Sequence, residues 1–162
     1  MQRERTCTFA GHREVYAAGV SERVDATIES ILRADTDFTF YTGDMGAFDR
    51  LCAGAVRRAQ RAHPNIHIKL ILVLPYLTEA LNANKEYYES AIDGILVPME
   101  LMGVHYKGAI QKRNRWMVNH SDYLIAYVRQ DFGGAYQTLR YARRQPELTI
   151  LNLADNGGNE IC

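Results

Sequence analysis

The segment Asp37-Phe38-Thr39-Phe40-Tyr41-Thr42-Gly43-Asp44-Met45-Gly46-Ala47-Phe48-Asp49 decides the fold class of this chain. Its first six residues are rich in aromatic and β-branched side chains, which is typical of a β-strand. From Phe48 to Ala62, small and apolar residues recur at helical spacing. The segment therefore predicts a strand and a helix joined by a short glycine loop.

The same alternation of strand and helix patterns continues through the chain. Ser21 is the expected N-cap of the first helix. Such alternation implies parallel strands, right-handed crossovers and helices on both faces of the sheet, so we expect a Rossmann-like three-layer α/β/α fold with a mainly parallel sheet. Further strands are predicted at 6–10, 66–74, 94–98, 123–128 and 148–153, and further helices at 21–34, 86–92, 107–120 and 134–144.

Length and charge narrow the class of protein. The 162 residues fit one domain, which we expect over 1–154, followed by a loose tail over 155–162. Lys plus Arg and Asp plus Glu both number 19, so no overall field attracts polyanions. The longest apolar run, 70–77, is too short to cross a bilayer, and the N-terminus has no secretory h-region. We therefore expect a cytoplasmic protein, with neither a membrane nor nucleic acid as a partner.

Cysteine and histidine spacing predicts no metal site and no cofactor. Cys7, Cys52 and Cys162 are odd in number and lack C-x-x-C spacing, which argues against a disulfide framework and a zinc cluster. The histidines also lack the spacing of zinc ligands. We expect the cysteines to be reduced thiols, with Cys7 and Cys52 packed as small hydrophobes.

The expected topology selects the residues that face a ligand. In open α/β sheets, ligands bind beyond the carboxyl ends of the strands, where the connections diverge. This rule brings together the segments that follow four of the predicted strands. They are Gly11-His12-Arg13, the loop from Thr42 to Asp49, Pro75-Tyr76 and the loop from Arg129 to Gly134.

Two of these segments place glycines before a helix. Backbone amides at a helix N-terminus have no intrahelical partner and favour an anion, and glycine allows close approach of a ligand. The alternative is that each is a plain tight turn. The hydroxyl of Thr138 either reaches the same ligand or bonds back to a carbonyl. The predicted ligand-binding residues of the two segments are Thr42, Gly43, Asp44, Gly46 and Phe48 in the first, and Gly133, Gly134 and Thr138 in the second.

Charged residues complete the candidate site. Arg13 offers a planar fork to phosphate, with a surface salt bridge as the alternative, and His12 is available as a donor, acid or base. Arg113 and Asn114 lie on or beside the apolar face of their helix, where a charge needs a partner such as a ligand phosphate or Asp122. Asp49 is the candidate catalytic carboxylate, although its place in a first helical turn also gives it a role through the helix dipole.

These residues together resemble the SLOG superfamily of Rossmann-like nucleotide-binding domains, especially its YspA/YpsA-like branch. The resemblance covers most of the chain and also suggests self-association, for which the apolar segment 99–102 is a candidate surface. Pro75 and Tyr76, already selected by the strand-end rule, are part of the predicted ligand set and of this resemblance. It rests on Phe9-Ala10-Gly11-His12-Arg13, the 42–49 loop, Leu72-Val73-Leu74-Pro75-Tyr76, Arg113-Asn114-Arg115-Trp116-Met117-Val118, and Ser121-Asp122-Tyr123-Leu124-Ile125-Ala126 followed by Gly133-Gly134.

The chain departs from the superfamily's enzymes at one decisive position. LOG phosphoribohydrolases carry a proline-glycine-glycine-x-glycine-threonine-x-x-glutamate motif with a catalytic glutamate, and an arginine on the preceding helix that Arg113 matches. Here Thr138 is followed three residues later by Tyr141, Gln137 replaces a glycine, and one residue is inserted. Asp44 also stands where a second loop glycine is common in the YspA-like pattern, which disfavours an anion there.

Three functions remain open at this stage. The leading hypothesis is a cytosolic, sensor-type domain that binds a nucleotide or nucleotide derivative through the glycine loops. The first alternative is an N-glycosidic hydrolase of nucleoside monophosphates, with Asp49 in place of the missing glutamate. The second is a module for single-stranded DNA, as in the DNA-processing protein A group of the superfamily, or for protein interaction.

Overall fold

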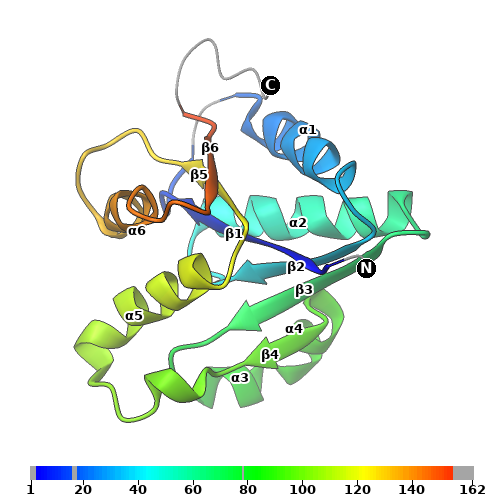
Figure 1. The fold of residues 1–162 in the computed structure, drawn as a ribbon. Coiled ribbons are helices and arrows are strands. Elements are labelled where there is room, and N and C mark those ends of the chain that lie inside the picture. Colours follow the sequence, from blue (N-terminus) through cyan, green and yellow to red (C-terminus); the bar gives the residue numbers. More distant parts are fainter. Residues whose placement is uncertain (1–2, 16–17, 78, 155–162) are drawn as a thin grey trace.

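The computed structural model describes residues 3–15, 18–77 and 79–154, which form a six-stranded sheet covered by helices (Figure 1). The strand order is β4-β3-β2-β1-β5-β6, and every pairing is parallel. This confirms the predicted Rossmann-like α/β fold. The strands are β1 (Arg5–Gly11), β2 (Asp37–Thr42), β3 (His67–Val73), β4 (Gly94–Leu96), β5 (Tyr123–Tyr127) and β6 (Thr149–Asn152).

The order of the strands reverses beside β1. The chain adds β2, β3 and β4 outward on one side of β1, and then crosses over to place β5 and β6 on the other side. The connections that leave β1 and β5 therefore run in opposite directions along the carboxyl edge of the sheet. A crevice between diverging connections is the usual ligand site in such folds.

The helices follow the predicted pattern, with two corrections. The first helix begins at Val20 behind Gly19, whose φ of +80° suits glycine, so Ser21 lies inside the first turn and is not the N-cap. The segment 79–83, which was not predicted, forms a helix of its own. The helices are α1 (Val20–Leu32), α2 (Ala47–Ala62), α3 (Glu79–Ala83), α4 (Lys85–Ala91), the 3-10 turn η1 (Met99–Leu101), α5 (Tyr106–Asn119) and α6 (Gly134–Ala142).

Alternate residues of the central strands enter two separate cores, because helices cover both faces of the sheet. Cys7 and Phe9 of β1 join the larger core with the buried faces of α1 and α2. Ala10 joins the smaller core, in which Leu139 of α6 packs against β5. Cys7 and Cys52 are both fully buried free thiols, as predicted.

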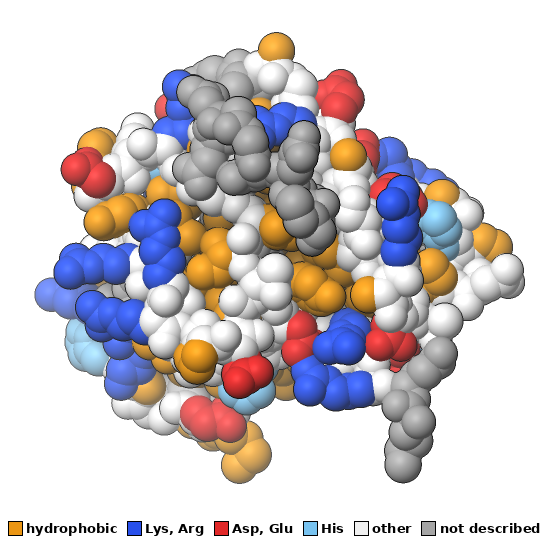
Figure 2. All heavy atoms as spheres, turned by 45° about the horizontal axis from the view of Figure 1, so that its top comes forward, with side chains coloured by type: hydrophobic (Ala, Val, Ile, Leu, Met, Phe, Trp, Pro, Cys, Tyr) orange, Lys and Arg blue, Asp and Glu red, His pale blue; other side chains and the backbone are white. Residues whose placement is uncertain are grey.

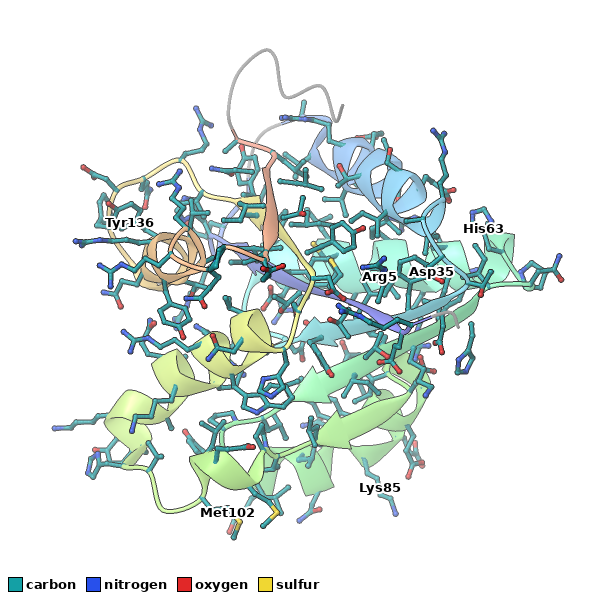
Figure 3. The ribbon with its side chains drawn as sticks, viewed as in Figure 1. Arg5, Asp35, His63, Lys85, Met102 and Tyr136 are labelled. Atoms are coloured by element: carbon teal, nitrogen blue, oxygen red, sulfur yellow. The ribbon has the colours of Figure 1, made fainter. Side chains whose placement is uncertain are left out.

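Opposite the carboxyl edge, where a ligand site is expected, ion pairs and hydrogen bonds lie at the amino edge of the sheet. Arg5 and Asp35 lie side by side there and form an ion pair of 3.2 Å (Figure 3). Asp122 accepts a hydrogen bond of 3.0 Å from the Thr6 amide. Asp122 is therefore not the partner of Arg113 that the sequence suggested. Across the described residues, no helix is both long and apolar enough to cross a membrane. The predicted tail, 155–162, lies outside the described residues.

Candidate functional site

A cavity of about 850 Å³ opens at the carboxyl edge of the sheet, where the connections after β1 and β5 diverge. Its walls are the segment after β1, the residues around the first turn of α6, and one face of α5. The volume lies within the range of ordinary ligand sites. The lining residues are Phe9, Ala10, Gly11, His12, Arg13, Glu14, Met45, Asp49, Ile110, Gln111, Arg113, Asn114, Met117, Tyr127, Arg129, Gln130, Phe132, Gly133, Gly134, Ala135 and Thr138.

The N-terminus of α6 supplies backbone donors to this cavity. Gly133 precedes the helix with φ +93° and ψ 175°, a conformation that only glycine adopts readily. No residue within the described ranges accepts a hydrogen bond from the amides of Gly134 and Ala135, which both line the cavity. Figure 3 labels Tyr136, the next residue of this turn. Open first-turn amides, together with the helix dipole, favour an anion at this end of the cavity.

Side chains of α5 add polar donors from the opposite wall. The Oδ1 atom of Asn114 accepts a hydrogen bond of 2.9 Å from Nε of Arg113, which leaves the Nδ2 donors of Asn114 for the cavity. The Nε2 atom of Gln111 lies 3.4 Å from the position that a β-carbon on Gly134 would occupy. Donors of α5 and of the α6 turn therefore face the same space. Arg13 and Arg129 are exposed and line it as well.

Arg113 is buried, with 2% of its surface exposed, and it holds two loops together. Its Nη1 donates to the carbonyls of Val73, at 3.0 Å, and Gly43, at 3.5 Å. Burial lowers the pKa of Arg113, and nearby Asp49 opposes this shift. A β-carbon on Gly43 would lie 2.8 Å from the guanidinium carbon. Gly43 is therefore required by the close approach of Arg113.

Asp49 brings a carboxylate to the cavity. Its Oδ2 accepts a hydrogen bond of 2.9 Å from the Met45 amide. Burial raises the pKa of Asp49 to about 6, against the opposing effects of the Met45 bond and of Arg113. A carboxyl group in a cleft that titrates near neutral pH is a candidate for acid or base chemistry. The Met45 bond shows at the same time that Asp49 has a structural role in its own loop.

His12 positions the loop that leads to α6. Its Nε2 accepts from the amides of Arg129, at 2.9 Å, and Gln130, at 3.4 Å. Burial, and then the charge of Arg129, lower the pKa of His12. The neutral ring with its proton on Nδ1 fits both observations. His12 thereby ties the segment after β1 to the segment after β5.

The first glycine loop differs from the prediction, because the amides of Asp44, Met45 and Ala47 are already bonded within the chain. The Asp44 amide donates to Oγ1 of Thr42 at 3.1 Å. The Ala47 amide, at the start of α2, donates to the carbonyl of Arg13 at 2.8 Å. A β-carbon on Gly46 would lie 2.6 Å from Cα of Arg13, so Gly46 permits the contact between the two loops. The geometry gives no support for an anion at the N-terminus of α2.

The cavity brings together about half of the predicted ligand residues. Phe48 is fully buried beneath Gly11 and stacks on Tyr127, with ring centroids 6.0 Å apart. The Thr138 hydroxyl donates to the Gly134 carbonyl at 3.0 Å, which is the back-bonded alternative. The lining includes Gly11, His12, Arg13, Arg113, Asn114, Gly133, Gly134, Thr138 and the candidate catalytic Asp49; it does not include Thr42, Gly43, Asp44, Gly46, Phe48, Pro75 or Tyr76.

Several lining residues were not predicted as site residues. Gln111 lies one helical turn before Asn114, so its spacing places it on the same side of α5. Arg129, Gln130 and Phe132 belong to the loop that the strand-end rule had selected, but only its glycines entered the prediction. The described residues contain no cluster of three or more metal-ligating side chains.

Comparison with known proteins shows a shared fold and one similar sequence. No family model matches the chain. A similar protein is the uncharacterized SPbeta prophage-derived protein YoqJ of Bacillus subtilis (strain 168). It is 24% identical over 140 residues, which cover 77% of this chain and 81% of YoqJ.

Two solved structures of DNA processing protein A share the fold. The Streptococcus pneumoniae protein aligns with a TM-score of 0.59 at 16% identity over 86% of this chain, which spans about half of that protein (47%). The Helicobacter pylori protein aligns with a TM-score of 0.60 at 19% identity over 95% of this chain and 68% of its own. The chain therefore has the Rossmann-like fold found in DNA processing protein A.

This comparison corrects one of our expectations. The Helicobacter pylori structure concerns a single-stranded DNA binding mode of that protein. The expectation that nucleic acid is not a partner is therefore wrong, because the same fold binds single-stranded DNA there. The physical reason is that a net charge of zero averages over the whole chain and hides local excesses of one sign.

Proposed function

We propose that the cavity binds the phosphate of a nucleotide or nucleotide derivative at the N-terminus of α6. The observation that carries the proposal is the pair of open amides at Gly134 and Ala135 inside a cavity whose opposite wall presents side-chain donors. Arg13 and Arg129 are exposed and supply positive charge at the same cavity. We further propose that the chain is a cytosolic member of the YspA-like branch of SLOG proteins.

The number of donors is sufficient for useful affinity. A hydrogen bond to a charged group contributes about 1.5 to 3 kcal/mol, and micromolar binding corresponds to about 8 kcal/mol. Two backbone amides, one arginine and one side-chain amide reach that range before the cost of ordering is subtracted. Arg113 is not among these donors, because its guanidinium is engaged with Val73 and Gly43.

Gly134→Asp tests the proposal with a matched control. The aspartate places a carboxylate where the phosphate is expected, and the helix dipole favours an acid there, so the protein keeps or slightly gains stability. We expect titration calorimetry at low salt to show binding of AMP or GMP by the wild type and none by this variant. Gly134→Asn, with the same shape and no charge, retains more of the affinity. Equal affinities in the two variants would refute an anion at this site.

Single-stranded DNA is a second candidate ligand, favoured by the distribution of charge along the chain and by the fold shared with DNA processing protein A. Between Tyr106 and Arg144 the chain carries eight Lys or Arg residues and only two carboxylates, Asp122 and Asp131. Figure 2 shows Lys and Arg side chains gathered on the left of its face, the side on which α5 and α6 lie in Figure 1. A local basic surface of this kind attracts a phosphate backbone.

Fluorescence anisotropy with a labelled deoxyoligonucleotide separates the two candidates. If single-stranded DNA is the ligand, its affinity falls steeply with salt, and Lys112→Glu with Arg140→Glu weakens it much more than it weakens AMP binding. If the ligand is a free nucleotide, the charge reversals leave AMP binding nearly unchanged, and the oligonucleotide binds weakly or not at all.

Hydrolysis of an N-glycosidic bond is a third candidate function, and the position and pKa of Asp49 favour it. The carboxyl group lines the cavity and has its pKa raised to about 6 by burial. Tyr141, at the position of the LOG glutamate, instead donates to Asn119 at 2.7 Å and does not line the cavity. Release of free base from a nucleoside monophosphate, lost in Asp49→Asn, would support this activity. Absence of release by the wild type would exclude it for the substrates tried.

Self-association is proposed on the exposed apolar side chains of one segment. Met99, the first residue of η1, and Met102, which follows this turn, are 81% and 72% exposed. Light scattering after size-exclusion chromatography measures the mass directly. We expect a multiple of 18.4 kDa that falls to the monomer mass in the double variant Met99→Lys with Met102→Lys.

A further inference from the structure

An exposed aromatic side chain lies at the candidate phosphate site. Phe132 is 64% exposed and lines the cavity immediately before Gly133. Of the eight large hydrophobic side chains that are exposed among the described residues, it is the only one in this lining. Single exposed hydrophobic side chains are common on protein surfaces, so the feature that sets Phe132 apart is its place beside the open amides of the α6 turn in this cavity.

The backbone on both sides of Phe132 is held in place. On one side, Nε2 of His12 accepts from the amides of Arg129 and Gln130. On the other, the carbonyl of Gly133 accepts from the Gln137 amide at 3.0 Å as α6 begins. A ligand that contacts the ring therefore loses little free energy in ordering the loop.

The cavity also contains groups that suit the edge of a flat heterocycle. Gln111, Asn114 and Gln130 all line it, and each carries a side-chain amide with both donor and acceptor atoms. Asn114 presents its Nδ2 donors, because its Oδ1 is bonded to Arg113. Amides of this kind form paired hydrogen bonds with base edges, while an aromatic face binds any base by stacking.

We propose that Phe132 is the stacking platform for the base of the ligand, with the phosphate held two to three residues further on, at the amides of Gly134 and Ala135. The inference rests on the proposed phosphate site, and it adds the chemical class of the group that the ligand carries besides its phosphate. The ligand carries an aromatic heterocycle as well as a phosphate, and a sugar phosphate alone occupies only part of the site. Phe132 is then the residue that distinguishes nucleotides from other phosphates.

Titration calorimetry with AMP, CMP and ribose 5-phosphate tests the proposal. We expect Phe132→Ala to weaken binding of AMP and CMP by about tenfold or more, while ribose 5-phosphate changes by less than about twofold. Phe132→Tyr retains wild-type affinity for all three. Tyr106→Ala is the matched control, because Tyr106 is 62% exposed and lies outside the cavity lining; it changes none of the affinities.

A fluorescence measurement gives a second readout. The chain has one tryptophan, Trp116, so Trp116→Phe combined with Phe132→Trp creates a single reporter at the loop. AMP quenches this reporter if the base stacks on it, and ribose 5-phosphate does not.

The outcomes separate this inference from the phosphate site itself. If the wild type binds ribose 5-phosphate as tightly as AMP, or if Phe132→Ala weakens both ligands equally, the phosphate site stands and the stacking role is refuted. If the wild type binds none of the three ligands at all, the phosphate site is refuted and the stacking role with it.

Discussion

Alanine at Gly46 and at Gly133 provides a sharp test of how the two glycine loops differ. Both residues precede a helix in nearly the same conformation, with φ of +99° and +93° and ψ close to 180°. Alanine is strained there by about 1 to 3 kcal/mol. At Gly133 nothing lies within 4 Å of the new β-carbon, so strain is the whole cost. At Gly46 the new β-carbon meets Cα of Arg13 at 2.6 Å.

The contact at Gly46 is with backbone, which cannot rotate away, so the two loops must separate. Overpacking of this kind adds about 1 to 3 kcal/mol. We therefore expect a loss of about 1 to 3 kcal/mol for Gly133→Ala and about 2 to 6 kcal/mol for Gly46→Ala. Urea unfolding with unchanged m-values measures both. Gly108→Ala, at an open helical position in α5, is the control and is neutral or stabilising. Equal losses at Gly46 and Gly133 would refute the contact between the loops.

Three further predictions follow from the charged residues. Burial raises the pKa of Asp49 to about 6, so ionisation of this carboxyl group is costly in the folded state and wild type loses stability as pH rises from about 4 to above 6. The Asp49→Asn variant does not pay this cost. Its free energy of unfolding relative to wild type should therefore increase by roughly 2 to 3 kcal/mol between denaturation experiments at pH 4 and at pH 7.5. Arg113→Met costs about 1 to 3 kcal/mol in urea unfolding because the buried carbonyl of Val73 loses its donor, and an unchanged free energy of unfolding would contradict that role. Asp93 is partly buried, yet the hydrogen bonds that it accepts from Arg57, Leu70 and Gln60 lower its pKa. Wild type therefore loses stability relative to Asp93→Asn as pH falls below about 4. A difference in the free energy of unfolding that stays constant over this pH range would contradict the prediction.

The sequence predicts the fold well because local pattern and topology agree. Strands and helices alternate with clear periods, and such alternation implies parallel strands joined by crossovers. The strand order, and with it the reversal beside β1, comes from the structure alone. The element that was missed, α3, is five residues long and has no room for a helical period. The N-cap of α1 was placed at Ser21 from side-chain preference, whereas the chain uses the conformational freedom of Gly19.

The candidate site is predicted less completely, because its details depend on contacts between distant residues. The strand-end rule selects the segments after β1 and β5 that line the cavity. It does not reveal that Arg113 donates to Val73, 40 residues away, or that this guanidinium approaches Gly43 too closely for a side chain. Gly43 was therefore interpreted as a ligand contact, when its neighbour is a side chain from another helix.

The two glycine-opened helices begin after a glycine in nearly the same backbone conformation, and they differ in what lies in front of their first amides. At α2 the carbonyl of Arg13 takes the Ala47 amide, so the polypeptide itself occupies the position where an anion would bind. At α6 the amides of Gly134 and Ala135 line a cavity, and His12 holds the loop before this helix by accepting from the Arg129 amide. A helix N-terminus becomes an anion site only where the fold leaves its donors open. The reversal of strand order beside β1 places the open amides of α6 at a cavity, which is why we propose the phosphate site there and not at α2.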